Sequence, residues 1–282
     1  MTVEKVEPFK AINIREVFLK KNPRLAKKLP GFLYRYITRI MHIDEINELL
    51  ANHGNEQGIE FANSMVKAFN VHQTLIGVEN IPASGRFIFA SNHPLGGFDA
   101  LLILGNLQRM LGDAVTLVND VLMSIPQLRP VFVPLNKHGG HPREVIQQLH
   151  ETYSSDKQIL IFPSGFASRM IKGKVQDFTW KKHFIAKAIE YQRDVIPVHV
   201  SGRNSNFFYR LARFRTFFKL KWNLEMFYLA DETFSHKNQN FTITFGKPIS
   251  YKHFDQSKTL DQWAAEVREM VYKLPNEAPK QD

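Results

Sequence analysis

Residues 86–99 have the sequence RFIFASNHPLGGFD, which contains the sharpest feature of the chain. Its first six residues, Arg86–Ser91, are mostly apolar and bulky, as is typical of a buried strand. Pro94 and the pair Gly96-Gly97 then predict a turn, because proline and glycine interrupt regular helices and strands. The residues beyond this turn have a helical pattern, so a strand, a turn and a helix are expected in succession.

The same alternation continues along most of the chain. Further strands are expected at Ala114–Val118, Val131–Pro134, Gln158–Phe162, Asp194–Val200 and Phe241–Phe245. Helices are expected near residues 98–112, 142–154, 179–192 and 204–217. Strands that alternate with helices predict an α/β fold, with a mixed sheet that is parallel in its centre and flanked by helices.

Three segments are expected in the domain organisation. Residues 1–75 have short amphipathic patterns and predict a helical, basic region, residues 76–250 the α/β domain, and residues 251–282 a C-terminal helix and tail. The last helix is expected near residues 258–273 and to end at Pro275, because proline interrupts helical hydrogen bonding.

The composition excludes several classes of protein. The 282 residues include no cysteine, so disulfides, thiolate metal sites and a cysteine nucleophile are excluded. No apolar run approaches the roughly 18–20 residues that cross a bilayer. Lys5, Glu7 and Lys10 interrupt any signal-peptide core. A transmembrane or signal-peptide secretory protein is therefore not expected.

The net charge of +10 is concentrated in two segments. Residues 1–40 have ten Lys/Arg against three Glu, and residues 203–221 have six Lys/Arg and no acid. Apolar residues at helical spacing accompany the charges, for example Phe32 and Tyr36 in the first segment and Phe214 and Phe218 in the second. Basic amphipathic helices are typical of membrane-surface binding, although the apolar stripes would also fit packing on the protein's own core. Basic proteins also bind nucleic acid, but the sequence contains no recognised nucleic-acid-binding motif.

His93 and Asp99 are the candidate catalytic residues. The glycine turn can return the Asp99 carboxylate to the imidazole of His93, where it would fix the tautomer and stabilise the imidazolium. The other ring nitrogen would then act as a general base on a hydroxyl or amine. A helix start, with Asp99 as an early-turn charge, fits the same spacing.

Other catalytic and metal-binding patterns are weak or missing. The chain has no Gly-x-Ser-x-Gly elbow, and Ser164 in residues 162–165 is the nearest imitation. His138 and His141 have loop spacing rather than the spacing of a metal-binding helix face, and no HExxH, Walker loop or GxGxxG occurs. We expect no metal and no bound cofactor.

Four blocks of sequence resemble the glycerolipid acyltransferase family. Asn92-His93 followed by Asp99 resembles its first block, written Asn-His-x4-Asp, and residues 131–137 stand where the second belongs. Residues 162–169 (FPSGFASR) resemble the third block and residues 195–198 (VIPV) the fourth. The order and spacing of the blocks match over roughly residues 75–250.

Departures from the usual pattern identify a branch. Five residues separate His93 from Asp99 instead of four, which is similar to the hemolysin-like branch that includes O-acyltransferases of amino-acid lipids. Ser164 replaces the common Glu of the third block, and Lys137 replaces the Arg of the second. In the family these two blocks help bind the acceptor phosphate, so a phosphate-bearing acceptor is disfavoured.

The resemblance implies a function and a set of site residues. It implies transfer of an acyl group from acyl carrier protein or coenzyme A, as a co-substrate, to the hydroxyl of a lyso-lipid, with a monoacylated amino-acid lipid favoured over 1-acylglycerol-3-phosphate. His93 and Asp99 would be catalytic. The expected substrate-binding residues are Asn92, Gly96, Gly97, Lys137, Ser164, Gly165, Arg169 and Arg203. For Arg203, which follows a predicted strand, a loop cation remains an equal alternative.

The expected partners and location follow from a lipid acceptor. The protein would bind an anionic membrane surface as a peripheral protein at the cytoplasmic face of the inner membrane, and no nucleic acid. A non-catalytic lipid- or nucleic-acid-binding protein is the alternative of another class.

Overall fold

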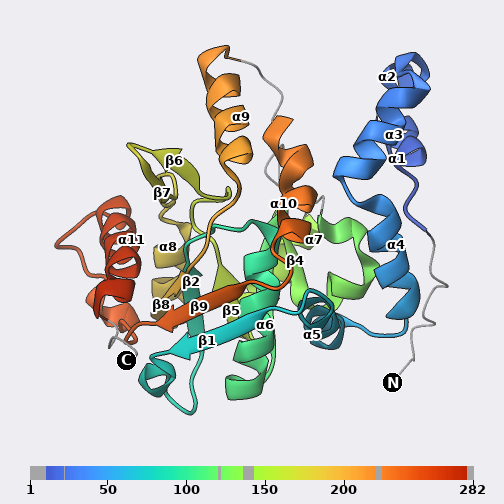
Figure 1. Cartoon of the computed structure of the whole chain (residues 1–282). Helices are drawn as coiled ribbons and strands as arrows, with labels where there is room; N and C mark the ends of the chain where they lie inside the picture. The colour runs from blue at the N-terminus through green and yellow to red at the C-terminus, as the bar shows by residue number, and fades with distance from the viewer. Residues whose placement is uncertain (1–10, 22, 120–121, 136–142, 220–223, 278–282) are drawn as a thin grey trace. The chain divides into compact units, whose positions relative to one another are not determined.

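The computed structural model describes residues 11–21, 23–119, 122–135, 143–219 and 224–277. Contacts divide the chain into two compact units (Figure 1). The helical unit comprises Met1–Gln57 and Asn204–Lys237, and the sheet unit comprises Gly58–Arg203 and Asn238–Asp282. This division differs from the three expected segments, because residues 58–75 and 251–282 group with the sheet unit and residues 204–237 group with the N-terminal helices.

The sheet unit contains a seven-stranded sheet with the order β1-β9-β8-β2-β5-β3-β4. The strands are β1 (His72–Ile76), β2 (Phe87–Ser91), β3 (Ala114–Asn119), β4 (Phe132–Leu135), β5 (Gln158–Ile161), β8 (Asp194–Val200) and β9 (Asn240–Phe245). Neighbouring strands are parallel except β8 and β9, which are antiparallel. The mixed sheet with a parallel centre is therefore confirmed.

Helices cover both faces of this sheet. These are α5 (Gly58–Ala68), α6 (Gly97–Leu111), α7 (Arg143–Ser154), α8 (His183–Tyr191) and α11 (Leu260–Glu277). All five residues of β2 are buried, as expected for a central parallel strand. Ile88 of β2 packs in the cluster that includes residues of α7, α8 and α11, whereas Phe89 on the other face contacts Phe245, and Phe98 of α6 contacts Phe241.

A second, two-stranded sheet lies between β5 and α8 in sequence. It is the antiparallel hairpin of β6 (Arg169–Ile171) and β7 (Lys174–Gln176), with Arg169 opposite Gln176. Gly173, with a φ of 78°, allows the two-residue turn.

The helical unit gathers both basic segments. Its helices are α1 (Ile14–Lys21), α2 (Pro23–Lys28), α3 (Gly31–Ile40), α4 (Ile43–Asn52), α9 (Asn206–Phe217) and α10 (Leu229–Ser235), with a short 3₁₀ turn at Leu224–Tyr228. The Tyr36 and Tyr228 hydroxyls are hydrogen-bonded, and His42 bonds Asp231 at 2.9 Å. Residues 36–42 and 228–231, far apart in sequence, are thus joined by specific contacts.

The secondary structure corrects three details of the sequence-based prediction. The last helix does not end at Pro275 but continues to Glu277, because a proline so near the helix end removes only one hydrogen bond. His72–Leu75 were expected at the end of the helical region, but His72–Ile76 form strand β1, which pairs with the distant β9. The hairpin β6–β7 was not expected, since its strands have three residues each.

Candidate active site

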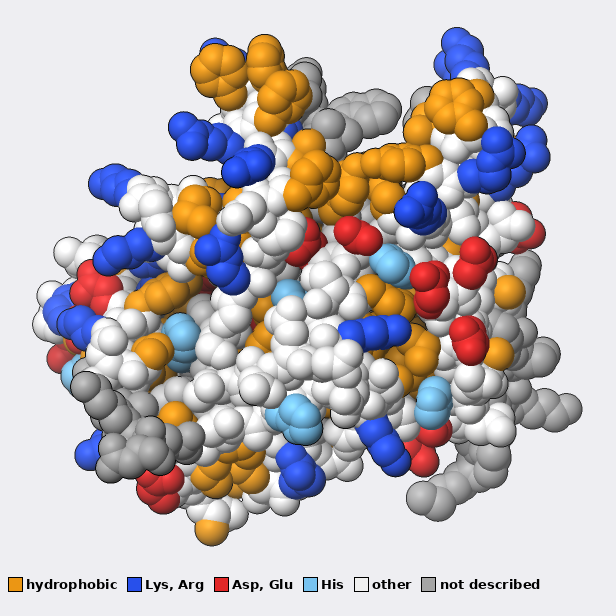
Figure 2. Space-filling view, viewed as in Figure 1, with side chains coloured by type: hydrophobic (Ala, Val, Ile, Leu, Met, Phe, Trp, Pro, Cys, Tyr) orange, Lys and Arg blue, Asp and Glu red, His pale blue; other side chains and the backbone are white. Residues whose placement is uncertain are grey.

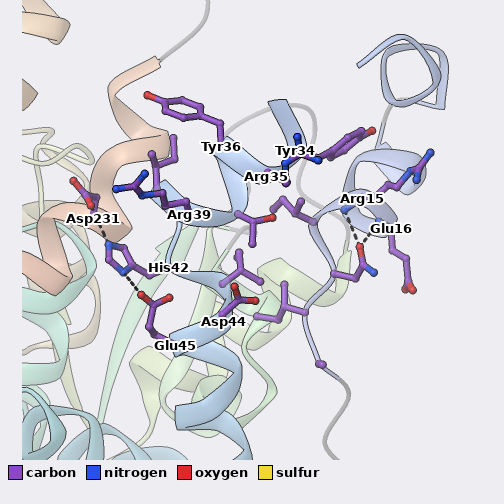
Figure 3. Close-up of a pocket in the computed structure, with 17 residues that line it drawn as sticks. Arg15, Glu16, Tyr34, Arg35, Tyr36, Arg39, His42, Asp44, Glu45 and Asp231 are labelled. Atoms are coloured by element: carbon purple, nitrogen blue, oxygen red, sulfur yellow. Dashed lines mark hydrogen bonds and ion pairs between the residues drawn. The ribbon is translucent and has the colours of Figure 1, made fainter. Parts of the chain in front are cut away.

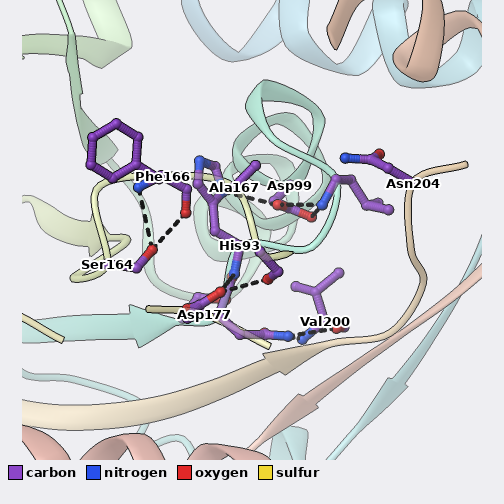
Figure 4. Close-up of polar contacts among 12 residues, drawn as sticks. His93, Asp99, Ser164, Phe166, Ala167, Asp177, Val200 and Asn204 are labelled. Carbon is purple, nitrogen blue, oxygen red and sulfur yellow. Dashed lines mark hydrogen bonds and ion pairs between the residues drawn. The ribbon is translucent and has the colours of Figure 1, made fainter. Parts of the chain in front are cut away.

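The His93 imidazole and the Asp99 carboxylate are in direct contact. Nδ1 of His93 lies 2.9 Å from Oδ2 of Asp99 (Figure 4). The chain reaches this geometry because β2 ends at Ser91, Gly96 adopts a φ of 79°, and α6 begins at Gly97. Asp99 therefore lies in the first turn of the helix and faces back toward the end of the strand.

The environment of Asp99 keeps this pair in one orientation. Its side chain has no solvent exposure, and its carboxylate also accepts the Leu95 N–H at 3.0 Å. Burial raises the pKa of Asp99 to about 6, against the opposing effects of the His93 hydrogen bond and charge and the Leu95 amide. The Asp99 carboxylate is placed to accept a hydrogen bond from the Nδ1–H group of His93.

The His93 ring is held from its face as well as its edge. Phe162, which directly follows β5, stacks on the imidazole with the ring centroids 4.0 Å apart and an interplanar angle of 23°. The ring retains 16% exposure, and no hydrogen bond reaches Nε2 within the described part of the chain. Nε2 is therefore the ring nitrogen that stays available to another group. The carboxyl ends of β2 and β5 converge here, as in other α/β sites.

Asn92 anchors the strand end rather than facing a substrate through its amide. It is buried, its Nδ2 donates to the Val200 carbonyl at 2.9 Å, and its Oδ1 accepts the Val200 N–H at 2.7 Å. These two bonds connect the end of β2 to the end of β8.

The third block lies beside the first. The Ser168 N–H donates to the His93 carbonyl at 2.7 Å. Ser164 is buried and donates from Oγ to the Phe166 carbonyl at 2.7 Å, and Gly165 has a φ of 69° in the same turn. Arg169 is also buried, and its Nη1 donates to the Ala167 carbonyl at 2.6 Å.

The remaining expected site residues lie in different settings. Gly97 begins α6, and a methyl group added at its Cα would meet no atom within 4 Å, so the backbone is open there. Arg203 is exposed and lies beyond β8. Lys137 lies outside the described residues.

The sequence model of the acyltransferase family matches residues 16–279 of this chain. The chain belongs to this family. It is 41% identical over 264 residues to the lyso-glycine lipid O-acyltransferase of Bacteroides thetaiotaomicron, a match that covers 93% of this chain and 97% of the relative. A protein of the same name from Phocaeicola vulgatus is 40% identical over 266 residues, covering 93% of this chain and 95% of that relative. The expectation of an O-acyltransferase enzyme is therefore confirmed.

A solved structure is also similar to the acyltransferase. It is the 1-acyl-sn-glycerophosphate (LPA) acyltransferase PlsC of Thermotoga maritima, with a TM-score of 0.47 and 18% identity. The match covers 93% of this chain and 86% of that structure.

One residue at the site of the acyltransferase was not expected from the sequence. Asp177, just after β7, is buried, and its Oδ1 accepts the backbone N–H of His93 at 3.2 Å. Burial raises the pKa of its carboxyl group, opposed by hydrogen bonds from Ser168 and Trp180. A lone acidic residue followed by Phe178 and Trp180 was the only signal in the sequence.

Other features of the acyltransferase lie apart from this dyad. Among the residues that the structure describes, no group of three or more His, Asp or Glu side chains is arranged to hold a metal ion. In the same part of the chain, no helix has both the length and the hydropathy needed to cross a membrane. A pocket of about 1320 Å³ lies within the helical unit, where His42 bonds Glu45 and Asp231 (Figure 3), and neither His93 nor Asp99 lines it.

Proposed function

We propose that this acyltransferase moves a fatty acyl group from a thioester to the hydroxyl of a monoacylated amino-acid lipid, with His93 as general base. The hydrogen bond between His93 Nδ1 and Asp99 Oδ2 is the observation that carries the proposal, because it leaves Nε2 for the proton of the acceptor. The lyso-lipid acceptor is supported by the two relatives, which are both named lyso-glycine lipid O-acyltransferase.

The reaction needs one base and no covalent enzyme intermediate. Nε2 of His93 takes the hydroxyl proton while the acceptor oxygen attacks the thioester carbonyl carbon. The C–S bond of the tetrahedral intermediate then breaks, and the leaving thiolate takes the proton back from Nε2. The products are an ester and a free thiol, so His93 and Asp99 return to their starting states. Asp99 stabilises the imidazolium during the two steps.

Backbone amides near the start of α6 would stabilise the oxyanion. The first N–H groups of a helix lack intrahelical partners and lie at the positive end of its dipole. The open backbone at Gly97 gives a negatively charged oxygen close access to these groups. Such donors are worth about 10²–10³-fold in rate each.

The third block favours an acceptor without phosphate. The Ser164 hydroxyl donates a hydrogen bond to the Phe166 carbonyl, and Nη1 of Arg169 donates to backbone carbonyls. In this placement, neither side chain presents the pair of charged N–H donors that binds two phosphate oxygens at once. A 1-acylglycerol-3-phosphate acceptor is therefore the second candidate.

The helical unit provides the membrane-binding surface in this proposal. We define its aromatic face as the exposed residues Phe32, Tyr36, Phe207, Phe214, Phe217 and Phe218. Hydrophobic and basic side chains lie next to one another over α9 (Figure 2). Exposed aromatics beside Lys and Arg bind the interface of an anionic bilayer, where each cation contributes about 1 kcal/mol. This surface would hold the enzyme as a peripheral protein at the cytoplasmic face of the inner membrane, where its acceptor is embedded.

The donor is acyl carrier protein or coenzyme A, and both are acidic. A direct assay tests the acceptor and the donor together. Purified enzyme is incubated with each acyl thioester and with either lyso-glycine lipid or 1-acylglycerol-3-phosphate, and products are measured by mass spectrometry. We expect diacylated glycine lipid from one donor. Preference for the phosphate acceptor would establish the second candidate, and no product from any pair would contradict the proposal.

A further inference from the structure

We propose that Asp177 is a positioning residue, which holds the backbone of His93 so that the imidazole meets the acceptor hydroxyl. The inference rests on the proposed function of His93 as general base. It concerns a second acid, distinct from Asp99, that contacts the main chain of the base instead of its ring.

The Asp177 carboxylate accepts hydrogen bonds from three residues of the sheet unit. Oδ1 accepts the His93 N–H at 3.2 Å and the Ser168 hydroxyl at 2.5 Å, and Oδ2 accepts the Trp180 Nε1–H at 2.8 Å. The side chain is 1% exposed, so little water competes for these bonds. Hydrogen bonds to a buried carboxylate are stronger than those between neutral groups.

The peptide groups of His93 are therefore held on both sides. Its N–H donates to Asp177, and its carbonyl accepts the Ser168 N–H at 2.7 Å. Asp177 also binds the Ser168 hydroxyl, so one carboxylate connects both clamping residues. Figure 4 shows Asp177 on the opposite side of His93 from Asp99. A misplacement of about 1 Å at a reacting group can cost about 10²-fold in rate.

The C-terminal helix fixes Asp177 in turn. The Asp177 N–H donates to the Tyr272 hydroxyl at 2.7 Å, and Arg268 Nη2 donates to the Asp177 carbonyl at 2.8 Å. Both residues belong to α11, for which the sequence indicated no role in catalysis. Through Asp177, the position of α11 on the sheet therefore helps to fix the position of the His93 main chain.

Only a carboxylate satisfies this set of donors. An asparagine amide in either orientation would place an NH₂ group against the Trp180 Nε1–H or against the His93 N–H and the Ser168 hydroxyl. Asp177→Asn therefore breaks the clamp with almost no change in volume.

The experiment compares Asp177→Asn with the wild type and with His93→Ala, using one thioester and one acceptor. We expect kcat to fall about 10- to 100-fold with KM within about twofold. This split between kcat and KM, measured per folded enzyme, is the readout, because a purely structural role would lower only the fraction of active enzyme.

Matched variants keep the inference testable. Asp194→Asn is the control, because Asp194 is also partly buried and accepts a backbone N–H, from Tyr251, but lies at the start of β8. We expect it to retain wild-type kcat. If Asp177→Asn does not fold, Ser168→Ala and Trp180→Phe each remove one donor from the carboxylate, and each should lower kcat several-fold.

The outcomes separate this inference from the proposed function. Wild-type kcat in Asp177→Asn, or unchanged kcat in both Ser168→Ala and Trp180→Phe, would overturn the positioning role if His93→Ala is inactive. Full activity of a folded His93→Ala would instead contradict the proposed function itself.

Discussion

The sheet unit and the helical unit use apolar residues in opposite ways. In the sheet unit, strands β2, β5 and β8 and helices α7, α8 and α11 contribute to one large buried cluster, and the dyad lies at the edge of this core. In the helical unit the buried cluster is small, centred on Ile14, Tyr34 and Ile43, while Phe217 remains 80% exposed. Dense packing holds reacting groups within fractions of an ångström. Exposed aromatic side chains favour binding to another surface.

The sharpest test of this contrast is removal of the base from the packed unit. His93→Ala should lower kcat by about 10²–10⁴-fold, because no other described side chain replaces Nε2 as base. The chain should still fold, with a lower free energy of unfolding, because Asp99 loses a hydrogen-bond partner and Phe162 loses its stacked ring. Both quantities are measured on the same preparation, by turnover and by urea denaturation. A folded variant with wild-type turnover would remove the assignment.

Asp99→Asn should show how much the burial of this carboxylate lowers the free energy of unfolding. Burial raises the pKa of Asp99 from 3.8 in the unfolded chain to about 6, so the native state binds more protons between these values. The wild type should therefore lose about 2 kcal/mol of stability relative to the variant as the pH rises from 4 to 6. Turnover should fall about 10²-fold, because the imidazole loses its orienting anion. Parallel unfolding curves at all pH values would contradict the role of burial.

The helical unit should respond to substitutions at its aromatic face with the reverse pattern. Replacing Phe214, Phe217 and Phe218 by Ser should weaken binding to anionic vesicles by about tenfold or more, with little change in stability. Ile146→Ser is the matched control, because this residue is 55% exposed on α7 of the sheet unit. Vesicle flotation measures both variants. Equal loss in the two, or none in the triple variant, would contradict the membrane-binding surface.

The smallest expected effect concerns the ring beneath the base. Phe162→Leu keeps an apolar side chain of similar size and removes the stacking on His93. An aromatic pair contributes about 0.5–1.5 kcal/mol beyond area, so kcat should fall about 2- to 10-fold. Steady-state kinetics measure this change. A fall as large as that of His93→Ala would indicate that Phe162 does more than orient the ring.

Local sequence was sufficient for the elements that carry the dyad. The strand, turn and helix expected from residues 86–99 occur as β2, the turn with Gly96, and α6. Each depends on nearby residues, namely a run of bulky apolar side chains and a glycine that tolerates positive φ. The strand at Asp194–Val200 also has the expected bounds.

Contacts between distant residues were not predictable in the same way. Asp177 is 84 residues from His93, and no local pattern relates the two. The grouping of residues 204–237 with the N-terminal helices likewise depends on pairs such as His42 and Asp231, which are 189 residues apart. Strand β1 needed its partner β9 before it could be recognised.

The amino-acid sequence by itself determined the α/β class, the identity of the His93–Asp99 pair and the two basic, aromatic segments, because each depends on spacing over a few residues. Only the tertiary structure decided that Asp177 bonds the main chain of His93 and is held in turn by α11, and that both basic segments belong to one unit. These contacts join residues that are distant in sequence. A buried carboxylate must be hydrogen-bonded, and its donors come from the segments that pack around it, which depend on the fold of the whole chain.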